Sequence, residues 1–463
     1  MTPSSHSSST LSIPELRNRF TGRLITPDDS DYDAVRTVMY GGNDLKPSLV
    51  VRVADVDDVA AAVTLARESG LELAVRSGGH SGAGHSTTDG GIVLDLRDLK
   101  QLEIDPEHRT VWADAGLTAG EVTVAAAEHR LAVGFGDTGS VGVGGITLGG
   151  GVGFLSRKHG LTIDSLLAAE IVTADGGVLR VDDESHPELF WAIRGGGGNF
   201  GVVTRFCFRL HPLQRIVGGM LILPATAETI AGFIAAAEAA PDELSTIANV
   251  LTCPPMPFVP PEHHGNLVIM ALVCYAGDPQ DGERAIAPLR ALAKPIADLV
   301  KTGSYPEMFP PEDPDYHPTA VARTLFVDHV DRPVAETILE RLRASDASLR
   351  VAQLRVLGGA IARVPADATA YAHRASPIMV NIAAFYDGPD DRPRREAWVV
   401  DFAAALHQGD DGVYVNFLGD EDKARVRAAY PDSTWDRLTK AKARYDPTNL
   451  FRRNQNIPPA GQG

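Results

Sequence analysis

The stretch Arg76–His85 carries residue types that could bind and react with an anionic cofactor. It reads Arg-Ser-Gly-Gly-His-Ser-Gly-Ala-Gly-His, so four glycines fall within seven residues. A backbone with so few Cβ atoms can turn tightly and point successive N–H groups at an anion. Arg76 adds a positive charge, and a phosphate or pyrophosphate is therefore the expected ligand. Because His80 would lie beside that ligand and an imidazole is both nucleophile and base, the loop is expected to react with its cofactor.

Two further glycine-rich segments follow, at Gly134–Gly153 and Arg194–Gly201. So many glycines indicate close approach to a flat or extended ligand, or to another backbone. A Rossmann fingerprint would need a strand, a turn, a helix and an acidic residue ~20 positions further on. Residues 149–153 lead instead into Phe154–Lys158, which lacks that helical pattern. The sequence therefore disfavours a Rossmann site.

Four motifs in a fixed order, between residues ~45 and 458, carry a family resemblance. They resemble flavoproteins of the vanillyl-alcohol-oxidase or p-cresol-methylhydroxylase type, and more closely their berberine-bridge-enzyme-like branch. That branch includes bacterial 6-hydroxynicotine oxidases, carbohydrate oxidases and antibiotic-tailoring oxidases. The four motifs are Arg76–His80, Gly139–Gly153, Leu189–Val203 and Tyr445–Ile457.

The resemblance implies an FAD cofactor held through a single covalent bond from His80 to the flavin 8α-methyl carbon. On its residue type alone, His80 could instead cap the loop by hydrogen bonding. Relatives with a second, cysteinyl link carry cysteine where this chain has Thr138, whose hydroxyl cannot replace a thiol; His85 is expected to be structural. The implied cofactor-binding residues are Arg76, Ser77, Gly78, Gly79, His80, Ser81, Thr138, Ser140, Val141, Gly144, Gly145, Thr147, Gly150, Gly151, Gly153, Val203, Tyr414, Asn416 and Asn454.

Tyr414 is the candidate catalytic base. Tyr414-Val415-Asn416-Phe417 resembles the family's strand facing the flavin, whose tyrosine is the base in alcohol and sugar oxidases. On a strand, alternation would place Tyr414 and Asn416 on one face. A tyrosine of ordinary pKa ~10 must have that pKa lowered to act near neutral pH, and nearby positive charge would do so. The simpler alternative is a core tyrosine with a satisfied hydroxyl.

Two further positions resemble substrate-side residues of the family. Tyr371 heads an aromatic-x-His-Arg motif and is a second catalytic candidate, whereas His373 and Arg374 are expected to be structural. Gln353 lies on a strand that resembles the substrate-facing one. The nicotine oxidases have a lysine near this point, so glutamine weakens an amine-oxidase assignment of that type.

The strand and helix patterns, together with the family resemblance, predict an α+β fold. The resemblance implies a two-part FAD-binding domain of the p-cresol-methylhydroxylase type, with an inserted antiparallel-sheet substrate domain backed by helices. Strand, helix and strand patterns precede the first loop, glycine thins out after residue 213, and 412–417 has a strand pattern. The expected domains are a tail and lead-in segment (1–42, disordered over 1–12), an FAD-binding domain (43–213), a substrate-binding domain (214–410) and a C-terminal segment returning to the flavin domain (411–463).

Composition excludes several classes of function. The chain has 43 basic and 60 acidic residues, a net charge of −17, which argues against nucleic acid or an anionic membrane as partner. No apolar run reaches the ~18 residues that span a bilayer, and no signal peptide is recognisable, so the cytoplasm is the expected compartment. The three cysteines form no disulfide framework, and the histidines show no metal-binding spacing.

The expected activity is that of an oxidase. Hydride would pass from a CH–OH group of a small molecule or sugar to flavin N5, with Tyr414 as base, and O2 would take the electrons to give peroxide. Val141 matches the small residue with which relatives admit oxygen, although the bulky Ile146 is close by. The alternatives are oxidation of a CH–N group, a dehydrogenase with another acceptor, and a flavin-holding scaffold without redox turnover.

Overall fold

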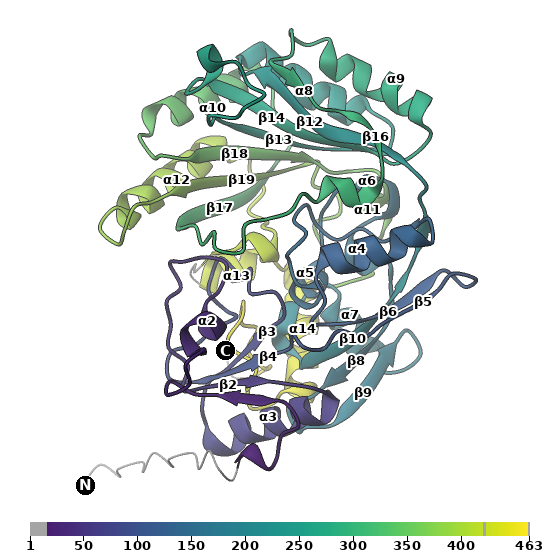
Figure 1. Cartoon of the computed structure of the whole chain (residues 1–463), viewed down its shortest axis with the longest axis vertical. Coiled ribbons are helices and arrows are strands. Elements are labelled where there is room, and N and C mark those ends of the chain that lie inside the picture. Colours follow the sequence, from purple (N-terminus) through teal and green to yellow (C-terminus); the bar gives the residue numbers. More distant parts are fainter. Residues whose placement is uncertain (1–15, 420–422, 462–463) are drawn as a thin grey trace.

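The protein, seen here as a computed structural model, is described over residues 16–419 and 423–461. The tail predicted to be disordered, 1–12, lies outside the described residues. Figure 1 shows two parts, an upper one from the middle of the chain and a lower one from both ends. The lower part has a core of residues from Leu16 to Leu210, joined by Ala370 and by residues from Val413 to Ile457. The upper part has its own core, between Val217 and Leu406.

The lower part contains two sheets that carry the first and third glycine-rich turns at their ends. One is mostly parallel, in the order β1-β2-β4-β3, with only β1 antiparallel to its neighbour. The other is antiparallel, in the order β5-β6-β10-β8-β9. Their strands are β1 (Arg23–Ile25), β2 (Leu49–Arg52), β3 (Leu73–Arg76), β4 (Ile92–Asp95), β5 (Leu102–Asp105), β6 (Thr110–Asp114), β8 (Leu166–Val172), β9 (Val178–Asp182) and β10 (Val202–Arg209).

Capping residues fix the helices that connect these strands. α3 begins after Asp55, whose carboxylate accepts the Asp58 N–H at 2.9 Å, and ends at Gly70 in the left-handed region. α4 begins at a capping box formed by Thr118 and Glu121. The helices of the lower part are α2 (Tyr32–Arg36), α3 (Val56–Ser69), α4 (Ala119–Glu128), α5 (Val143–Gly149), α6 (Ser156–His159), α7 (Pro187–Ile193), α13 (Lys423–Ala428) and α14 (Asp432–Tyr445).

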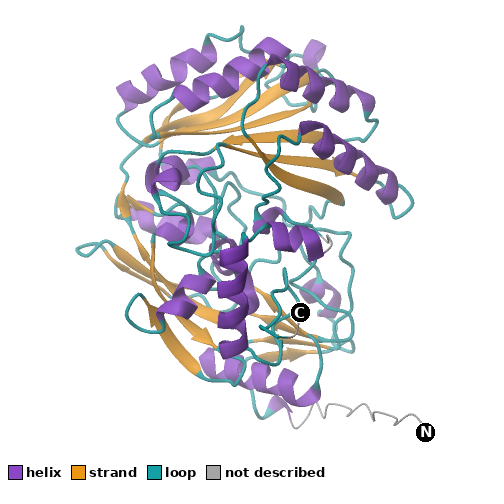
Figure 2. Cartoon of the chain, turned by 180° about the vertical axis from the view of Figure 1, so that it is seen from behind, coloured by secondary structure: helices purple, strands orange, loops and turns teal. Residues whose placement is uncertain are grey.

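The upper part is one antiparallel sheet backed by helices. Its strand order is β15-β12-β14-β13-β18-β19-β17, and β16 also pairs with β12. Figure 2 shows the long helices gathered on the outer side of this sheet. The strands are β12 (Ile216–Pro224), β13 (Leu244–Thr252), β14 (Leu267–Tyr275), β15 (Ala297–Asp298), β16 (Lys301–Gly303), β17 (Ala320–Val327), β18 (Arg350–Val356) and β19 (Ile378–Phe385), and the helices are α8 (Ala227–Ala239), α9 (Pro279–Arg290), α10 (Arg332–Ala344), α11 (Ala360–Arg363) and α12 (Arg392–Leu406). The predicted fold is therefore confirmed.

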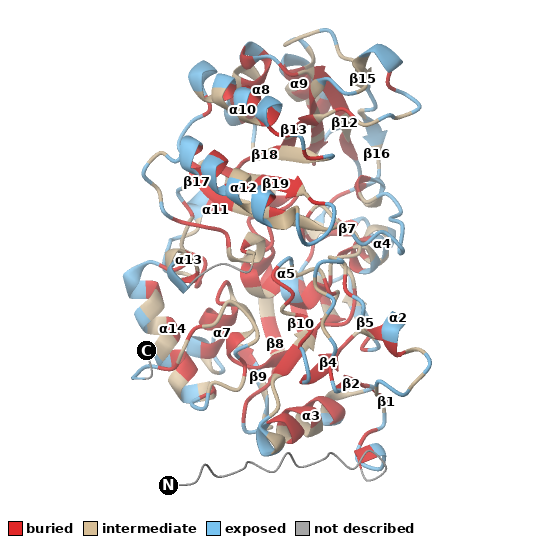
Figure 3. Ribbon diagram, turned by 90° about the vertical axis from the view of Figure 1, so that its left-hand side faces the viewer, coloured by how far each residue is buried: buried red, intermediate tan, exposed pale blue. Residues whose placement is uncertain are grey.

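The two faces of the large sheet contact different parts of the molecule. On β18, Ala352 and Leu354 belong to the core under the helices, whereas Gln353 and Arg355 lie on the opposite face. Figure 3 shows the matching pattern on the helices, buried toward the sheet and exposed outward. On α10 the buried side chains recur at helical spacing, at Ala335, Ile338, Leu339 and Leu342. The opposite face, which among the described helices has only the short α6 and α11 beside it, is thereby turned toward the glycine-rich loops. No helix in the described part of the chain is long and apolar enough to cross a bilayer.

One local prediction from the sequence is wrong. The segment 412–417 is not a strand: it is irregular up to Tyr414 and then forms the 3-10 turn η5 (Val415–Phe417). It lies against the second glycine-rich segment, which contains the short helix α5. This contact between distant segments decides the local conformation, and periodicity in a short window does not report such contacts.

A buried ion pair holds the C-terminal segment in the lower part. The Lys442 ammonium group is fully buried and donates to Asp446 at 2.7 Å, to the Asn199 carbonyl at 2.7 Å and to the Phe451 carbonyl at 2.8 Å. Asp446 in turn accepts the main-chain N–H groups of Leu450 and Phe451. The pair therefore fixes the end of α14 to the third glycine-rich turn.

Two histidines stack where the lower part continues into the upper one. The rings of His159 and His211 lie 4.0 Å apart, nearly parallel, and the Ser165 hydroxyl is 3.0 Å from His211 Nε2. Burial lowers the pKa of His159 to about 3, and the neighbouring His211 and Lys158 act in the same direction. Burial and the charges of Arg209 and Lys158 lower the pKa of His211 to about 4. Both rings are therefore neutral at neutral pH.

This stacked pair predicts an acid sensitivity of the fold. Histidines in the unfolded chain titrate near ~6.5, so between there and pH ~3 the unfolded chain binds more protons than the native one. The free energy of unfolding then falls as the pH falls through this window. We expect the urea midpoint of His159→Gln and of His211→Gln to depend less on pH between 7 and 4 than that of the parent protein. An unchanged pH dependence in both variants would contradict the prediction.

Candidate active site

The first two glycine-rich segments touch each other through their glycines. A Cβ atom on Gly78 would lie 2.2 Å from the Gly142 nitrogen, and one on Gly142 would lie 2.1 Å from the Gly78 nitrogen. No other residue fits at either position. Gly79, with φ 79°, adopts a left-handed conformation that favours glycine. The Ser77 hydroxyl, bonded to the Ala115 carbonyl at 2.6 Å and the Gly144 N–H at 3.2 Å, joins the same two segments.

Arg76 has a different role from the predicted one. Its side chain is fully buried, and its guanidinium donates to the carbonyls of Ser86, Val35 and Arg36 at 3.0, 2.6 and 3.1 Å. Burial lowers the pKa of Arg76 to about 10. The arginine therefore ties the start of the loop to the end of α2, and those donors do not face an anion.

His80 lies at the contact between the first and second segments. Its Nε2 is 3.0 Å from the Ser140 hydroxyl, which is 2.5 Å from a carboxylate oxygen of Glu312. Burial lowers the pKa of His80, and Glu312 opposes this more weakly. The imidazole is therefore neutral at neutral pH, the state in which it is a nucleophile. Further along the loop, the Ser81 hydroxyl accepts the His85 N–H at 3.3 Å.

The second segment has one side open and the other against Tyr414. A Cβ atom on Gly145 would meet no atom within 4 Å, and the buried Thr147 hydroxyl has no hydrogen-bond partner among the described residues. Gly150, with φ 135°, lies under the rings of Tyr414 and Tyr371. Gly151 and Gly153 pack against Thr162 and the Gly136 backbone, while Thr138 and Val141 are half-buried in the approach to α5.

Tyr414 and Asn416 meet the second segment although they are not on a strand. The Tyr414 hydroxyl oxygen accepts the Gly151 N–H at 2.8 Å and an Asn416 side-chain N–H at 3.0 Å. Asn416 also donates to the Ile146 carbonyl at 3.1 Å. The tight turn η5, rather than strand alternation, brings the two side chains together. An oxygen that accepts two N–H groups is prepared to carry negative charge.

Burial dominates the acidity of Tyr414. It raises the pKa of the phenol above its ordinary value, and the Gly151 N–H, the Asn416 amide and the positive charge of Arg355 oppose that rise in this order. The predicted positive charge is thus present, but its effect is smaller than that of burial. The phenol is neutral at neutral pH, and its conjugate base gains population toward alkaline pH.

The other two catalytic candidates lie on either side of this group. The Tyr371 ring is 6.0 Å from that of Tyr414, at 74°, and its buried hydroxyl has no hydrogen-bond partner in the described part of the chain. Burial raises the pKa of Tyr371 strongly. Gln353 donates to Asn249 at 2.9 Å and accepts from Arg355 at 2.8 Å. The large sheet therefore presents a chain of polar groups toward the second segment.

The remaining predicted residues support the site from behind. Val203 is buried in β10 and pairs with Ile171. Asn454 donates to the carbonyls of Gly198 and Phe451 at 3.1 and 3.0 Å, next to the third glycine-rich turn. His373 bonds to the Ala429 carbonyl at 2.9 Å, and Arg374 forms a buried two-point ion pair with Asp164 at 2.7 and 2.8 Å.

Three charged residues of the site were missed in the sequence. Arg355 is buried, bonds to Asp137 at 2.6 Å and to the Val152 carbonyl at 3.3 Å, and lies 5.1 Å from the Phe417 ring centre. Strand alternation could have found it, since it lies two residues after Gln353. Asp137 and Glu312 lie in loops, where no periodicity marks them.

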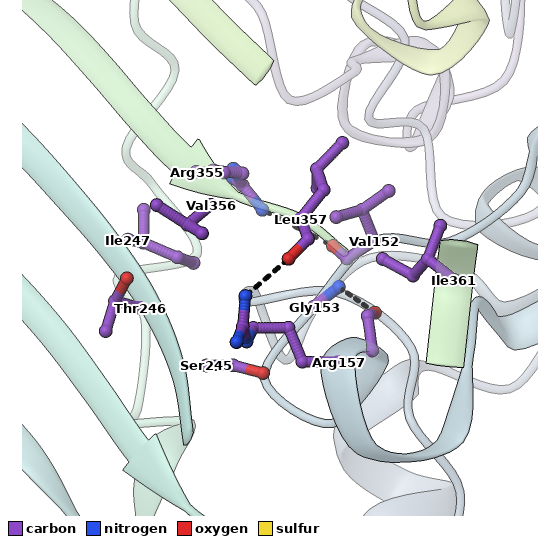
Figure 4. A pocket seen from close by; sticks show the side chains of 11 residues that line it. Val152, Gly153, Arg157, Ser245, Thr246, Ile247, Arg355, Val356, Leu357 and Ile361 are labelled. Atoms are coloured by element: carbon purple, nitrogen blue, oxygen red, sulfur yellow. Dashed lines mark hydrogen bonds between the residues drawn. The ribbon is translucent and has the colours of Figure 1, made fainter. Parts of the chain in front are cut away.

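A small cavity lies behind the second segment, at its junction with the large sheet (Figure 4). Its volume is about 10 Å³, which suffices for no more than one water molecule. Arg157 reaches across it to the Leu357 carbonyl at 2.6 Å and extends to the Ala240 carbonyl at 2.9 Å. The cavity therefore lies at the junction of the two parts and is too small to be a substrate site.

The residues fit a flavin nucleotide. Space for a ligand is open beside Gly145, where an added Cβ atom would meet no neighbour. The Thr147 hydroxyl and the carboxamide oxygens of Asn454 and Asn456 are buried and have no hydrogen-bond partner among the described residues. A hydroxyl and two amide oxygens can bond to the donors and acceptors of a ribose, a pyrophosphate or a ring amide. Among the residues described, no group of three His, Cys, Asp or Glu side chains could hold a metal ion.

Comparison with known proteins agrees with this geometry. Residues 47–182 match the family described as FAD binding domain, and residues 413–458 match the one described as berberine and berberine like. The (R)-6-hydroxynicotine oxidase of Paenarthrobacter nicotinovorans is 33% identical over 95% of this chain and 97% of its own. The xylooligosaccharide oxidase of Thermothelomyces thermophilus is 30% identical over 89% and 88% of the two chains.

A solved structure shows the same arrangement along the whole chain. The 6-hydroxy-D-nicotine oxidase of Arthrobacter nicotinovorans superposes with a TM-score of 0.85 at 30% identity, covering 97% of this chain and 99% of that one. The two matched families, the full-length relatives and this superposition together show that the protein binds FAD and is an oxidoreductase. The chain belongs to the berberine-bridge-enzyme-like FAD-linked oxidases.

Proposed function

We propose that this oxidase takes hydride from a CH–OH group of a small molecule or sugar, with FAD covalently bound through His80 and O2 as electron acceptor. The observation that carries the proposal is the Tyr414 hydroxyl, whose oxygen accepts the Gly151 N–H and an Asn416 N–H. An alcohol must lose a proton as it loses hydride, so its oxidation requires a base at this point. The relative from Thermothelomyces thermophilus is named as an oxidase of xylooligosaccharides, a CH–OH substrate class.

The flavin, when bound, supplies the two-electron acceptor; the side chains supply the rest. Tyr414 accepts the proton of the substrate hydroxyl, and Asn416 and Gly151 hold the phenol oxygen and stabilise its charge. The buried cation of Arg355 lowers the pKa of the same phenol, acting against burial. Tyr371, which packs against Tyr414, and Gln353, which bonds to Arg355, would orient the hydroxyl groups of the substrate. Peroxide is the expected product of O2.

Oxidation of a CH–N group is the second candidate, and one observation favours it. Burial raises the pKa of Tyr414, so the phenol is neutral near neutral pH. A neutral amine can lose hydride without transferring a proton to a strong base. The relative from Paenarthrobacter nicotinovorans is named as an oxidase of 6-hydroxynicotine, which is an amine. Gln353 stands against this candidate, because it replaces the lysine of the nicotine oxidases.

Anaerobic mixing with a substrate panel tests the proposal. The panel comprises alcohols, oligosaccharides, cyclic amines and polyketide-like glycosides, and bleaching of the flavin absorbance near 450 nm reports hydride transfer. Bleaching by an alcohol or sugar, followed by peroxide formation on admission of air, supports a CH–OH oxidase. Bleaching by amines alone selects the second candidate, and bleaching without peroxide identifies a dehydrogenase. No bleaching by any compound would contradict the oxidation of these substrate classes.

Thr138 offers a test of the position of the second segment. If it occupies the place of the cysteine that forms a second flavin link in relatives, Thr138→Cys should gain that link. We expect the double variant His80→Ala, Thr138→Cys to keep flavin in acid-precipitated protein, and the control His80→Ala, Thr138→Ser to lose it. Colourless precipitate from both double variants would show that residue 138 does not face the flavin.

A further inference from the structure

Three side chains from distant parts of the sequence form a linear chain of hydrogen bonds at His80. The Ser140 hydroxyl lies 3.0 Å from His80 Nε2 and donates to Glu312 Oε2 at 2.5 Å. The Ser140 main-chain N–H donates to the other oxygen of the same carboxylate at 3.2 Å. Both oxygens of Glu312 are therefore held by one residue, which fixes the carboxylate relative to the hydroxyl.

The direction of these bonds follows from the donors available. A carboxylate only accepts, so the single hydroxyl proton of Ser140 points to Glu312. The Ser140 oxygen must then accept from His80, which places the imidazole proton on Nε2. The Nδ1 atom carries the free lone pair and is the nucleophilic nitrogen of His80.

We propose that Ser140 and Glu312 form a proton relay that takes the Nε2 proton of His80 while Nδ1 bonds to the flavin 8α-methyl carbon. The inference rests on the covalent link proposed above and assigns two further residues to its formation. Glu312 is the base of the relay, and Ser140 passes the proton to it.

The reaction balances with O2 as oxidant. A C–N bond forms between Nδ1 and the methyl carbon, one methyl C–H bond breaks, and the imidazole N–H bond breaks. The methyl hydrogen would leave as a proton, and its electron pair would pass to the ring system of the flavin. The relay carries the second proton, that of the imidazole, from Nε2 through Ser140 to Glu312, which then releases it. O2 takes the two electrons and becomes H2O2, whose two protons balance the one from the methyl group and the one from the imidazole.

The surroundings of His80 make a base necessary. Alkylation of Nδ1 without loss of the Nε2 proton would leave a cation on a ring whose environment already disfavours charge, because burial lowers the pKa of His80. Glu312 is the titratable group that acts on His80 against burial. Loss of the proton to its carboxylate avoids a buried cation.

The loop that carries Glu312 is held against the second segment by independent contacts. It follows the 3-10 turn η4 (Tyr305–Met308) and precedes β17. The Phe309 ring packs edge-on against those of Phe154 and Tyr305, at 5.7 and 5.4 Å. Phe309 also lies 3.3 Å from where a Cβ atom of Gly139 would be. The upper part of the protein thereby reaches the attachment site of the lower part.

Glu312→Gln separates a relay from a hydrogen bond, because the amide oxygen still accepts from Ser140 but takes up no proton. The full-length protein is produced in a riboflavin-starved host, mixed with FAD in air, and sampled for acid-stable flavin fluorescence on denaturing gels between pH 6 and 9. We expect attachment in Glu312→Gln to be at least tenfold slower at pH 7 and to accelerate about tenfold per pH unit as hydroxide replaces the carboxylate. Glu312→Asp should restore much of the rate.

Two matched controls accompany this measurement. Asp313→Asn removes the neighbouring carboxylate of the same loop, which caps the Asp315 N–H, and should attach flavin at the parent rate. Reversible FAD binding, followed by absorbance, shows that each variant retains its site. Ser140→Ala should be as slow as Glu312→Gln, whereas Ser140→Thr, which keeps a hydroxyl, should be faster.

The outcomes distinguish this inference from the function on which it rests. Attachment in Glu312→Gln at the parent rate and with the parent pH profile would overturn the relay, as would slow attachment in Ser140→Ala alone. Flavin that is never attached in the parent protein would instead overturn the covalent link through His80. Slow, pH-accelerated attachment in Glu312→Gln, with normal reversible binding, would support the relay.

Discussion

Tyr414→Phe is expected to reduce the rate of flavin reduction by a CH–OH substrate about 10²- to 10⁴-fold, the usual contribution of a general base. The substitution removes the oxygen that accepts the Gly151 and Asn416 N–H groups and leaves the ring, with its contacts to Tyr371 and Phe417, in place. Because burial raises the pKa of Tyr414, the phenolate fraction of the parent protein increases across pH 7 to 10. The parent rate should rise about tenfold per pH unit there, and that of Tyr414→Phe should not.

Anaerobic stopped-flow mixing with whichever panel compound bleaches the parent flavin measures both effects. Tyr371→Phe is the matched control, since it removes the other buried hydroxyl of the same aromatic pair. We expect it to retain the pH dependence with a smaller loss of rate. A Tyr414→Phe variant that keeps the parent rate and profile would show that the proton leaves by another route, as it can in amine oxidation.

His80→Ala is expected to abolish the covalent attachment of FAD. The alanine removes the ring nitrogen proposed to bond to the flavin and leaves the contacts between the first two segments at Gly78 and Gly142 unchanged. The protein should still bind FAD reversibly, so that it is yellow when purified with added cofactor. After acid precipitation the pellet should be colourless, and a denaturing gel should show no flavin fluorescence.

His85→Ala provides the comparison, because it removes the second histidine of the same loop. We expect this variant to keep its flavin through acid precipitation. Acid-stable flavin in His80→Ala would show that another residue forms the bond. Loss of acid-stable flavin from His85→Ala alone would show that His85, and not His80, is the attachment residue.

The flavin-binding motifs could be predicted from the sequence because the local backbone conformation requires glycine at several of their positions. Gly78 and Gly142 are dictated by a backbone contact, and Gly79 and Gly151 by a left-handed conformation. Such demands leave a pattern in the residues themselves. The family resemblance rests on this pattern, and the fold that it implied is the one observed.

The parts that could not be predicted depend on contacts between segments that are separated in the sequence. The segment at Tyr414 alternates like a strand, yet it turns into η5 because Tyr414 and Asn416 bond to Gly151 and Ile146. Glu312 lies in a proline-rich loop with no periodicity, and only its fixed position beside Ser140 distinguishes it from other surface carboxylates. Arg76 was assigned to an anion, but buried carbonyls take up its donors.

The ion pair of Lys442 and Asp446 has a consequence for biosynthesis. The lower core needs residues from Leu16 to Leu210 and also the strip from Val413 to Ile457, which is synthesised after the whole upper half. The upper core, between Val217 and Leu406, includes no residue of that strip. The lower core, and the site that Tyr414 and Asn416 complete, can therefore form only after the upper half has been synthesised.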